Sequence, residues 1–256
     1  MARVTLLRGA SVAASPYPGA WVTTGVRWAK RLSPPGYSLV LLEAALVPGG
    51  TVAWGPDHGD EAVYVVTGEV EVDGRRCPAG GAVVVESGVS TVLRASRATR
   101  IVHCSPADPD PPTDGLNGPA APDGHGVHVV GPAGWFRSGA KEGVVATWYA
   151  DGSCPTCRIA LFKVDHHGGM VGRLHSHSRD EIIFVLDGVV ALGPRRQPAG
   201  TAICVPADVT YKTAYPVATT FLNFRADVAE QRNGRHGTPI VDGALARGGE
   251  LVGDLR

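Results

Sequence analysis

The stretch GMVGRLHSHSRDEIIFVLDG, residues 169–188, carries two histidines and a glutamate in a pattern typical of a metal site. His175 and His177 are two residues apart, so on a β-strand their side chains point to the same face. Glu181 follows after a short turn and begins the next strand, which places its carboxylate beside the two imidazoles. Two histidines and one carboxylate can hold a divalent ion and leave positions open for substrate or water. A buried ionised glutamate is also costly without a cation. The sequence therefore predicts one metal ion on His175, His177 and Glu181.

The same segment has a counterpart earlier in the chain. Residues 61–69 (EAVYVVTGE) resemble residues 181–189 (EIIFVLDGV), and residues 75–80 (RRCPAG) resemble residues 195–200 (RRQPAG), both at an offset of 120. The two halves are therefore predicted to be copies of one fold. Short β-branched or aromatic runs, bounded by Gly, Pro or Asp, recur in both halves and are typical of strands. We predict an all-β chain with two tandem sandwiches or barrels.

The first copy lacks most of the candidate ligands. Only the carboxylate of the predicted site is kept, as Glu61, while the other counterparts at the offset of 120 are Gly55, Asp57 and Thr91. The first copy is therefore predicted to be degenerate and free of metal. A weak metal site on Asp57, Glu61 and His103 is the alternative.

Between the copies lies a segment rich in Pro, Asp and Gly, which break both helix and strand. We predict an N-terminal barrel over residues 1–110, a linker over 111–124, and a C-terminal barrel with the metal site over 125–256. A helix is expected near 228–232, and the Gly-rich tail 235–256 is expected to wrap the other half.

From Gly169 to Gly188 the sequence resembles the first motif of the cupin family: Gly, five residues, His-x-His, three or four residues, Glu, six residues, Gly. The stretch GTAICVPADVTYKTAY, residues 200–215, resembles the second cupin motif with three departures. The motif glycine, metal-binding histidine and asparagine are replaced by Asp208, Tyr211 and Tyr215. The resemblance implies two cupin barrels of the double-stranded β-helix, or jelly-roll, type, with a metal ion in the second. It does not specify a reaction.

Tyr211 stands where the fourth metal ligand of a cupin is usually found. It has three interpretations: a phenolate ligand, a group beside the ion that acts as acid or base on substrate, or a residue that only closes the barrel. The second is favoured, because a neutral phenol with a pKa near 10 is a poor ligand unless the metal ionises it. Tyr211 is thus a predicted catalytic residue.

Arg173 is the other predicted catalytic residue, because on a continuous strand it shares the inward face with His175. A buried cation needs an anion near it, and Glu181, Asp208 and a substrate carboxylate are the candidates. Asn223 and Arg225 also share one face of their predicted strand. The pocket is therefore expected to take a small anionic or hydroxylated molecule.

The chain has 24 Lys plus Arg and 24 Asp plus Glu, so its formal net charge is zero. A neutral chain gives no support for nucleic acid or an anionic membrane as a partner. Its five cysteines, an odd and sparse set, do not suggest a secreted disulfide framework, and a soluble cytoplasmic protein is predicted. Cys154 and Cys157 form a CxxC, which fits a structural zinc site, a redox pair or two ordinary thiols.

Three functions compete. The first is a mononuclear non-haem iron oxygenase, a dioxygenase-type oxidoreductase acting on a small organic molecule, with manganese, nickel, cobalt or zinc as alternatives to iron. The second is a lyase, isomerase, cyclase or hydrolase that uses the metal as a Lewis acid. The third is a non-catalytic binder or sensor. The resemblance also implies a homodimer, unless the internal pair of barrels already covers the associating surface.

Overall fold

The computed structural model describes residues 3–17, 21–108, 126–151, 156–234, 236–242 and 250–252. Within these ranges the only helical element is the short 3-10 helix η1 (Gly9–Ser11), and the rest is strand, turn and loop. The all-β prediction is confirmed. No helix in the described ranges is long and apolar enough to cross a membrane. The predicted linker 111–124 lies outside the described residues.

One sheet holds the first copy, which we call the first repeat (residues 39–106). Its strands follow the order β10-β7-β4-β9-β3-β8-β5-β6, and β2 also pairs with β3. Their bounds are β2 (Val22–Arg31), β3 (Leu39–Trp54), β4 (Glu61–Thr67), β5 (Glu69–Val72), β6 (Arg75–Pro78), β7 (Ala82–Val85), β8 (Thr91–Ala95), β9 (Thr99–Pro106) and β10 (Val127–Val130).

Three sheets hold the second copy, the second repeat (residues 159–226), and its flanks. Their orders are β1-β19-β16-β21-β13-β12-β11-β24, β14-β20-β17-β18 and β15-β22-β23. The bounds are β1 (Thr5–Arg8), β11 (Phe136–Lys141), β12 (Val144–Asp151), β13 (Ala160–His166), β14 (Met170–Val171), β15 (His175–His177), β16 (Glu181–Asp187), β17 (Val189–Leu192), β18 (Arg195–Pro198), β19 (Thr201–Val205), β20 (Thr213–Tyr215), β21 (Thr219–Arg225), β22 (Ala229–Asn233), β23 (Pro239–Asp242) and β24 (Glu250–Leu251).

The two repeats share their strand registers as well as their sequence pattern. The strand that begins with the glutamate, β4 in the first repeat and β16 in the second, pairs with two equivalent neighbours: β7 and β9 in the first repeat, β19 and β21 in the second. Both strands have a β-bulge after their fifth residue. Partners in the first repeat recur 120 residues later: Glu61 faces Val85 and Val63 faces His103, as Glu181 faces Val205 and Ile183 faces Asn223. The sequence repeat is therefore a repeat of strand pairing.

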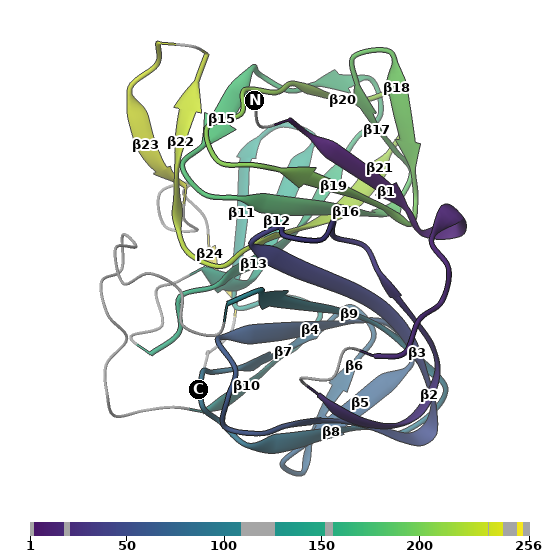
Figure 1. The fold of residues 1–256 in the computed structure, drawn as a ribbon. Helices are drawn as coiled ribbons and strands as arrows, with labels where there is room; N and C mark the ends of the chain where they lie inside the picture. The colour runs from purple at the N-terminus through teal and green to yellow at the C-terminus, as the bar shows by residue number, and fades with distance from the viewer. Residues whose placement is uncertain are drawn as a thin grey trace.

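The repeats exchange one strand each. β1, at the start of the chain, pairs with β19 of the second repeat, while β10 pairs with β7 of the first repeat. Figure 1 shows β1, in dark purple, running beside β19 and away from the other early strands. β1 lies in the predicted N-terminal domain 1–110 but pairs with a strand of the C-terminal domain 125–256, and β10 does the reverse. The domain boundaries themselves stay a prediction.

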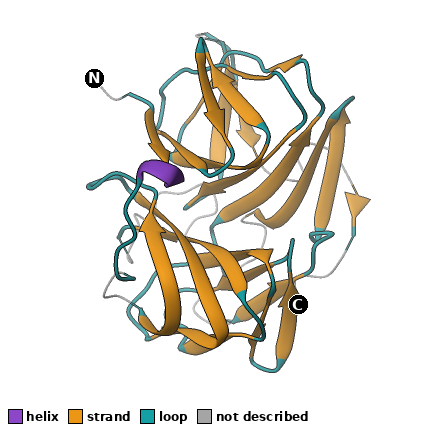
Figure 2. Cartoon of the chain, turned by 90° about the vertical axis from the view of Figure 1, so that its right-hand side faces the viewer, coloured by secondary structure: helices purple, strands orange, loops and turns teal. Residues whose placement is uncertain are grey.

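Both faces of the central strands are buried, which explains their uninterrupted apolar sequences. Along β4, Ala62 and Tyr64 belong to a core shared with the second repeat, whereas Val63 and Val65 belong to a separate core of the first repeat. This alternation follows from the two-residue period of a strand. It also places Glu61 on the face of Val63, inside its own repeat. Figure 2 shows the two stacks of strands that enclose these cores.

The segment after β21 differs from the prediction. The expected helix near 228–232 is wrong, because this segment forms β22, the first strand of a hairpin with β23. The hairpin pairs with β15 of the second repeat through β22. The tail 235–256 was expected to wrap the other half, but its described strands β23 and β24 pair with β22 and β11 of the second half. Residues 243–249 and 253–256 of the predicted tail lie outside the described part of the chain. The hairpin brings Asp242 to the candidate site.

Candidate functional site

β15 and the residue Tyr211 are joined directly. His175 and Tyr211 form an isolated bridge in which each backbone N–H donates to the other's carbonyl, at 3.0 and 2.9 Å. Their rings lie 4.4 Å apart between centroids. His177 follows on the same strand, and its ring centroid lies 5.0 Å from that of His175. The structure thus brings together His175, His177 and Tyr211, as predicted.

Glu181 begins β16 and is fully buried. Tyr211 donates its hydroxyl hydrogen to Oε1 of Glu181, and Asn223 donates to Oε2 at 2.8 Å. Burial alone would raise the pKa of Glu181, but His177, Arg225 and these hydrogen bonds lower it to about 2. Burial, and then the Glu181 charge, raise the pKa of Tyr211 well above its ordinary value. The carboxylate is therefore ionised at neutral pH and the phenol is neutral.

Arg225, on β21, supplies the cation beside Glu181. Its side chain is only 1% exposed. The guanidinium donates to Oε2 of Glu181, at 3.1 Å from Nη2 and 3.4 Å from Nε, and its Nη1 lies 2.7 Å from Oδ2 of Asp242. Its Nη2 also lies 3.2 Å from Nε2 of His177. Arg225 therefore provides the positive charge that stabilises the buried carboxylate of Glu181.

His177 lies between two carboxylates. Its Nε2 is 3.8 Å from Oε1 of Glu181, and its Nδ1 is 3.5 Å from Oδ2 of Asp242. Burial is the largest influence on this imidazole and lowers its pKa to about 4, despite the two carboxylates. The ring is therefore neutral near pH 7. A guanidinium only donates, so Nε2 accepts from Arg225 and Nδ1 carries the hydrogen.

A cavity of about 500 Å³ opens above these residues. Its polar lining includes His175, His177, Tyr211, Asn223 and Arg225. Oδ1 of Asn223 is buried and has no hydrogen-bond partner among the residues that the structure describes. His175 is half-buried, and its Nδ1 donates to the carbonyl of Arg173 at 2.8 Å. In the neutral ring this leaves Nε2 of His175 as an acceptor.

Apolar side chains also line the cavity. They are Val144, Ala146, Phe162, Val164, Ile183, Phe221, Ile240 and Val241. The cavity lining is therefore a mixture of polar and apolar side chains.

Arg173 does not lie on the inward face that the sequence analysis predicted for it. Its side chain is exposed at the edge of the cavity rather than buried beside His175. The expectation of a buried Arg173 is wrong because residues 172–174 do not continue the strand between β14 and β15. Strand alternation therefore does not carry from Arg173 to His175. The buried arginine of the site is Arg225.

The predicted ligands are close together, but they do not form a ready metal site. The described residues contain no group of three or more His, Cys, Asp or Glu side chains placed to hold an ion. Nε2 of His177 and both oxygens of Glu181 already accept hydrogen bonds. In this arrangement the residues do not fit a bound ion. The ligand assignment stays a prediction, as does a metal role for the CxxC, because Cys154 lies outside the described residues.

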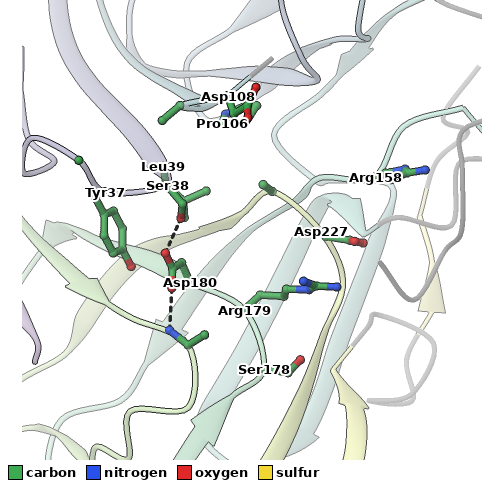
Figure 3. Close-up of a pocket in the computed structure, with 14 residues that line it drawn as sticks. Tyr37, Ser38, Leu39, Pro106, Asp108, Arg158, Ser178, Arg179, Asp180 and Asp227 are labelled. Carbon is green, nitrogen blue, oxygen red and sulfur yellow. Dashed lines mark hydrogen bonds between the residues drawn. The ribbon is translucent and has the colours of Figure 1, made fainter. Parts of the chain in front are cut away.

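A second cavity, of about 480 Å³, lies between the repeats (Figure 3). One wall is the turn 178–180, which joins His177 to Glu181. Figure 3 shows Ser38 of the first-repeat side directed at Asp180, to which it donates a hydrogen bond. The Tyr37 hydroxyl lies 2.9 and 2.8 Å from the carbonyl oxygens of Glu181 and Val205. The first-repeat side thus holds the backbone that positions the second-repeat site.

The matching place in the first repeat is packed with rings. Glu61 accepts from Trp21 Nε1 at 2.9 Å and Trp54 Nε1 at 2.5 Å, and lies 2.6 Å from Nε2 of His103. Tyr17 lies 2.8 Å from Nδ1 of His103. Asp57 is exposed and is not part of this cluster. The weak metal site considered for Asp57, Glu61 and His103 is therefore not assembled.

Sequence reasoning missed Asp242 at the second-repeat site and Tyr17, Trp21 and Trp54 at the first-repeat site. None of them was singled out by a motif, and Asp242, Tyr17 and Trp21 reach their sites from segments outside the repeats. Asn223 and Arg225 could be found from the sequence, because both lie on one face of a predicted strand.

No family model matches the sequence, and no curated protein matches it. Solved structures do match. A single-residue variant of Bacillus subtilis oxalate decarboxylase has a TM-score of 0.65 and 14% identity, over 94% of this chain and 80% of that one. A putative glyoxylate-induced protein of Pseudomonas aeruginosa has a TM-score of 0.67 and 16% identity, over 86% of this chain and 88% of that one. At such identities the likeness establishes a common fold: the chain has the cupin fold.

Proposed function

We propose that the chain is a cupin enzyme that binds a small hydroxylated carboxylate in the cavity of the second repeat and changes it by proton transfer. The observation that carries this proposal is the unpartnered Oδ1 of Asn223 in the cavity lining. A buried acceptor without a donor costs on the order of 1–3 kcal/mol. A ligand hydroxyl that donates to Oδ1 removes that cost.

The charge at the cavity edge supports a carboxylate on the same ligand. Arg173 is exposed there, and a guanidinium matches a carboxylate with two parallel hydrogen bonds. The apolar side chains Phe162, Phe221 and Ile240 would contact the carbon skeleton. The neighbour named oxalate decarboxylase acts, by its name, on another small carboxylate.

His175 is the group proposed to move the proton. Its Nδ1 is committed to the carbonyl of Arg173, which leaves Nε2 to accept a proton from the bound molecule. Tyr211 is less suited than the sequence indicated, because it already donates its hydrogen to Glu181. Tyr211 is proposed instead to hold the carboxylate of Glu181 in place. The reaction class is that of the second function considered above, a lyase or isomerase, but the proton is moved by His175 and not with the help of a metal acting as Lewis acid.

A metal ion enters the proposal only through the fold likeness. One neighbour is described with Mn(II) centres, so the fold favours manganese over iron where a cupin binds an ion. When bound, such an ion would act as a Lewis acid. The iron oxygenase predicted from the sequence has no support beyond the two histidines and the carboxylate. No step of the present proposal passes through a metal.

The finer architecture is also proposed here. Two tandem barrels are supported by the strand registers that recur after 120 residues.

The test is a ligand screen followed by NMR in D₂O. Small hydroxy acids such as lactate and malate are compared with matched acids that lack the hydroxyl, using calorimetry. A hydroxy acid is expected to bind best, and Asn223→Leu is expected to weaken it about tenfold. Wild type should convert the ligand or exchange one of its hydrogens for deuterium, whereas His175→Asn should bind without doing so. Equal binding of both acid series, or an unaffected Asn223→Leu, contradicts the proposal.

A further inference from the structure

Arg225 reaches the atoms on which the predicted metal ion depends. An ion held by His177 and Glu181 needs the lone pair of one imidazole nitrogen and an oxygen of the carboxylate. Nη2 of Arg225 lies 3.2 Å from Nε2 of His177 and 3.1 Å from Oε2 of Glu181. One guanidinium nitrogen therefore bridges two of the three predicted ligands.

The two uses of His177 exclude each other. An imidazole nitrogen has a single lone pair, and metal–nitrogen bonds are about 2.0–2.1 Å long. While Nε2 accepts from Arg225, that lone pair cannot bind an ion. The other ring nitrogen, Nδ1, carries the hydrogen and faces Oδ2 of Asp242 at 3.5 Å.

Both carboxylate oxygens of Glu181 also accept hydrogen bonds. Tyr211 donates to Oε1, and Asn223 and Arg225 donate to Oε2. A guanidinium keeps its charge at every pH at which proteins fold, so the electrostatic need for a cation is met permanently. Arg225 is in turn held by Oδ2 of Asp242 at 2.7 Å. A metal ion from solution would have to displace the guanidinium of Arg225. This cation is part of the chain and is hydrogen-bonded to His177, Glu181 and Asp242.

We infer that Arg225 has taken the place of the metal ion of the cupin site, so that the second repeat works without a metal. Arg225 provides the fixed positive charge that orients Glu181 and His177. A divalent ion binds these side chains only after Arg225 is removed. The inference rests on the contacts of Arg225 and not on the identity of the substrate.

Equilibrium dialysis of metal-stripped protein against Mn²⁺, with Zn²⁺ and anaerobic Fe²⁺ in parallel, tests this inference. Wild type and His177→Ala are expected to retain the same amount of metal per chain, because no ion is bound to His177 in wild type. Arg225→Gln is expected to bind Mn²⁺ at least about tenfold more tightly than wild type, because it leaves a buried carboxylate without its cation. Glu181→Gln added to Arg225→Gln should abolish that gain. Arg232→Gln, a charge removal at an exposed position of β22, should behave as wild type.

Two results overturn the inference: wild type that holds one ion per chain and loses it in His177→Ala, or an Arg225→Gln variant that binds no more tightly than wild type. If Arg225→Gln does not fold, the comparison of wild type with His177→Ala decides alone. No substrate enters this experiment. Its failure therefore leaves the hydroxy acid screen unaffected, and the failure of that screen leaves this result intact.

Discussion

Glu61 and Glu181 occupy the same place in two copies of one strand arrangement, yet different partners surround them. Glu61 is held by His103 and two indoles, and the rings of Trp21, Trp54 and Tyr17 lie 4.7–6.0 Å from the His103 ring between centroids. Glu181 is held by Arg225, Asn223 and Tyr211 beside a cavity.

The difference lies in which neighbours neutralise each carboxylate. A buried carboxylate is costly unless it is paired and hydrogen-bonded. The first repeat meets this condition by filling the space with aromatic donors. The second repeat meets it with one arginine, which leaves room for a ligand. At the offset of 120, the residue that matches Arg225 is Ser105.

Arg225→Met gives the largest expected effect on this comparison. It leaves Glu181 and Asp242 buried without their shared cation, and breaking a buried pair in this way costs about 3–5 kcal/mol. The free energy of unfolding, from urea titration in the presence of a chelator, measures the loss. The matched change Ser105→Ala should cost about 1 kcal/mol. Equal losses at the two positions would remove the contrast between the repeats.

Glu61→Gln tests the first repeat, with an expected loss of about 2 kcal/mol at pH 7 from its charged hydrogen bonds. Burial alone would raise the pKa of Glu61, but His103 and the other donors lower it below its ordinary value of 4.5. The ionised carboxylate therefore adds stability above pH 4.5, and that stability is lost as the pH falls through the folded-state pKa. Urea titrations across this range should show a weaker acid dependence in Glu61→Gln than in wild type. An unchanged dependence contradicts the assignment.

Tyr211→Phe should cost about 1.5 kcal/mol, because it removes a hydrogen bond to a buried charge. Its counterpart Thr91 donates at 3.0 Å to Asp73, whose side chain is 54% exposed, and Thr91→Ala should cost about 0.5 kcal/mol. Thermal unfolding of both variants checks the order. A larger loss for Thr91→Ala would mean that Tyr211 does not hold Glu181.

Asp208→Gly gives the smallest effect and the opposite sign. Asp208 has a φ of 59°, and Gly88, its counterpart in the first repeat, has a φ of 77°. Glycine adopts this left-handed conformation without strain, so Asp208→Gly should stabilise the protein by about 0.5–1 kcal/mol. Gly88→Ala should destabilise it by about 1 kcal/mol. Calorimetric melting temperatures that move in the same direction for both variants would be the contrary result.

The sequence predicted the all-β fold, the repeat and the meeting of His175, His177 and Glu181, because each of these follows from strand periodicity and spacing. The place of Tyr211 beside them was implied by the resemblance to the second cupin motif. The sequence could not predict that Arg225 would satisfy Glu181. Alternation placed the side chain of Arg225 on one face with Asn223, but a contact between β21 and β16 depends on strand pairing across the sheet. The error at Arg173 has a similar cause, since a two-residue period holds only while the strand is continuous.

The most direct measurement is the room-temperature EPR signal of free Mn²⁺ added in equal amount to metal-stripped wild-type protein. If Arg225 stands in place of the ion, the six-line signal of the hydrated ion keeps its full intensity, and it falls only with Arg225→Gln. Loss of the signal with wild type, and its return with His177→Ala, would show that the second repeat is a metal site and would contradict the account.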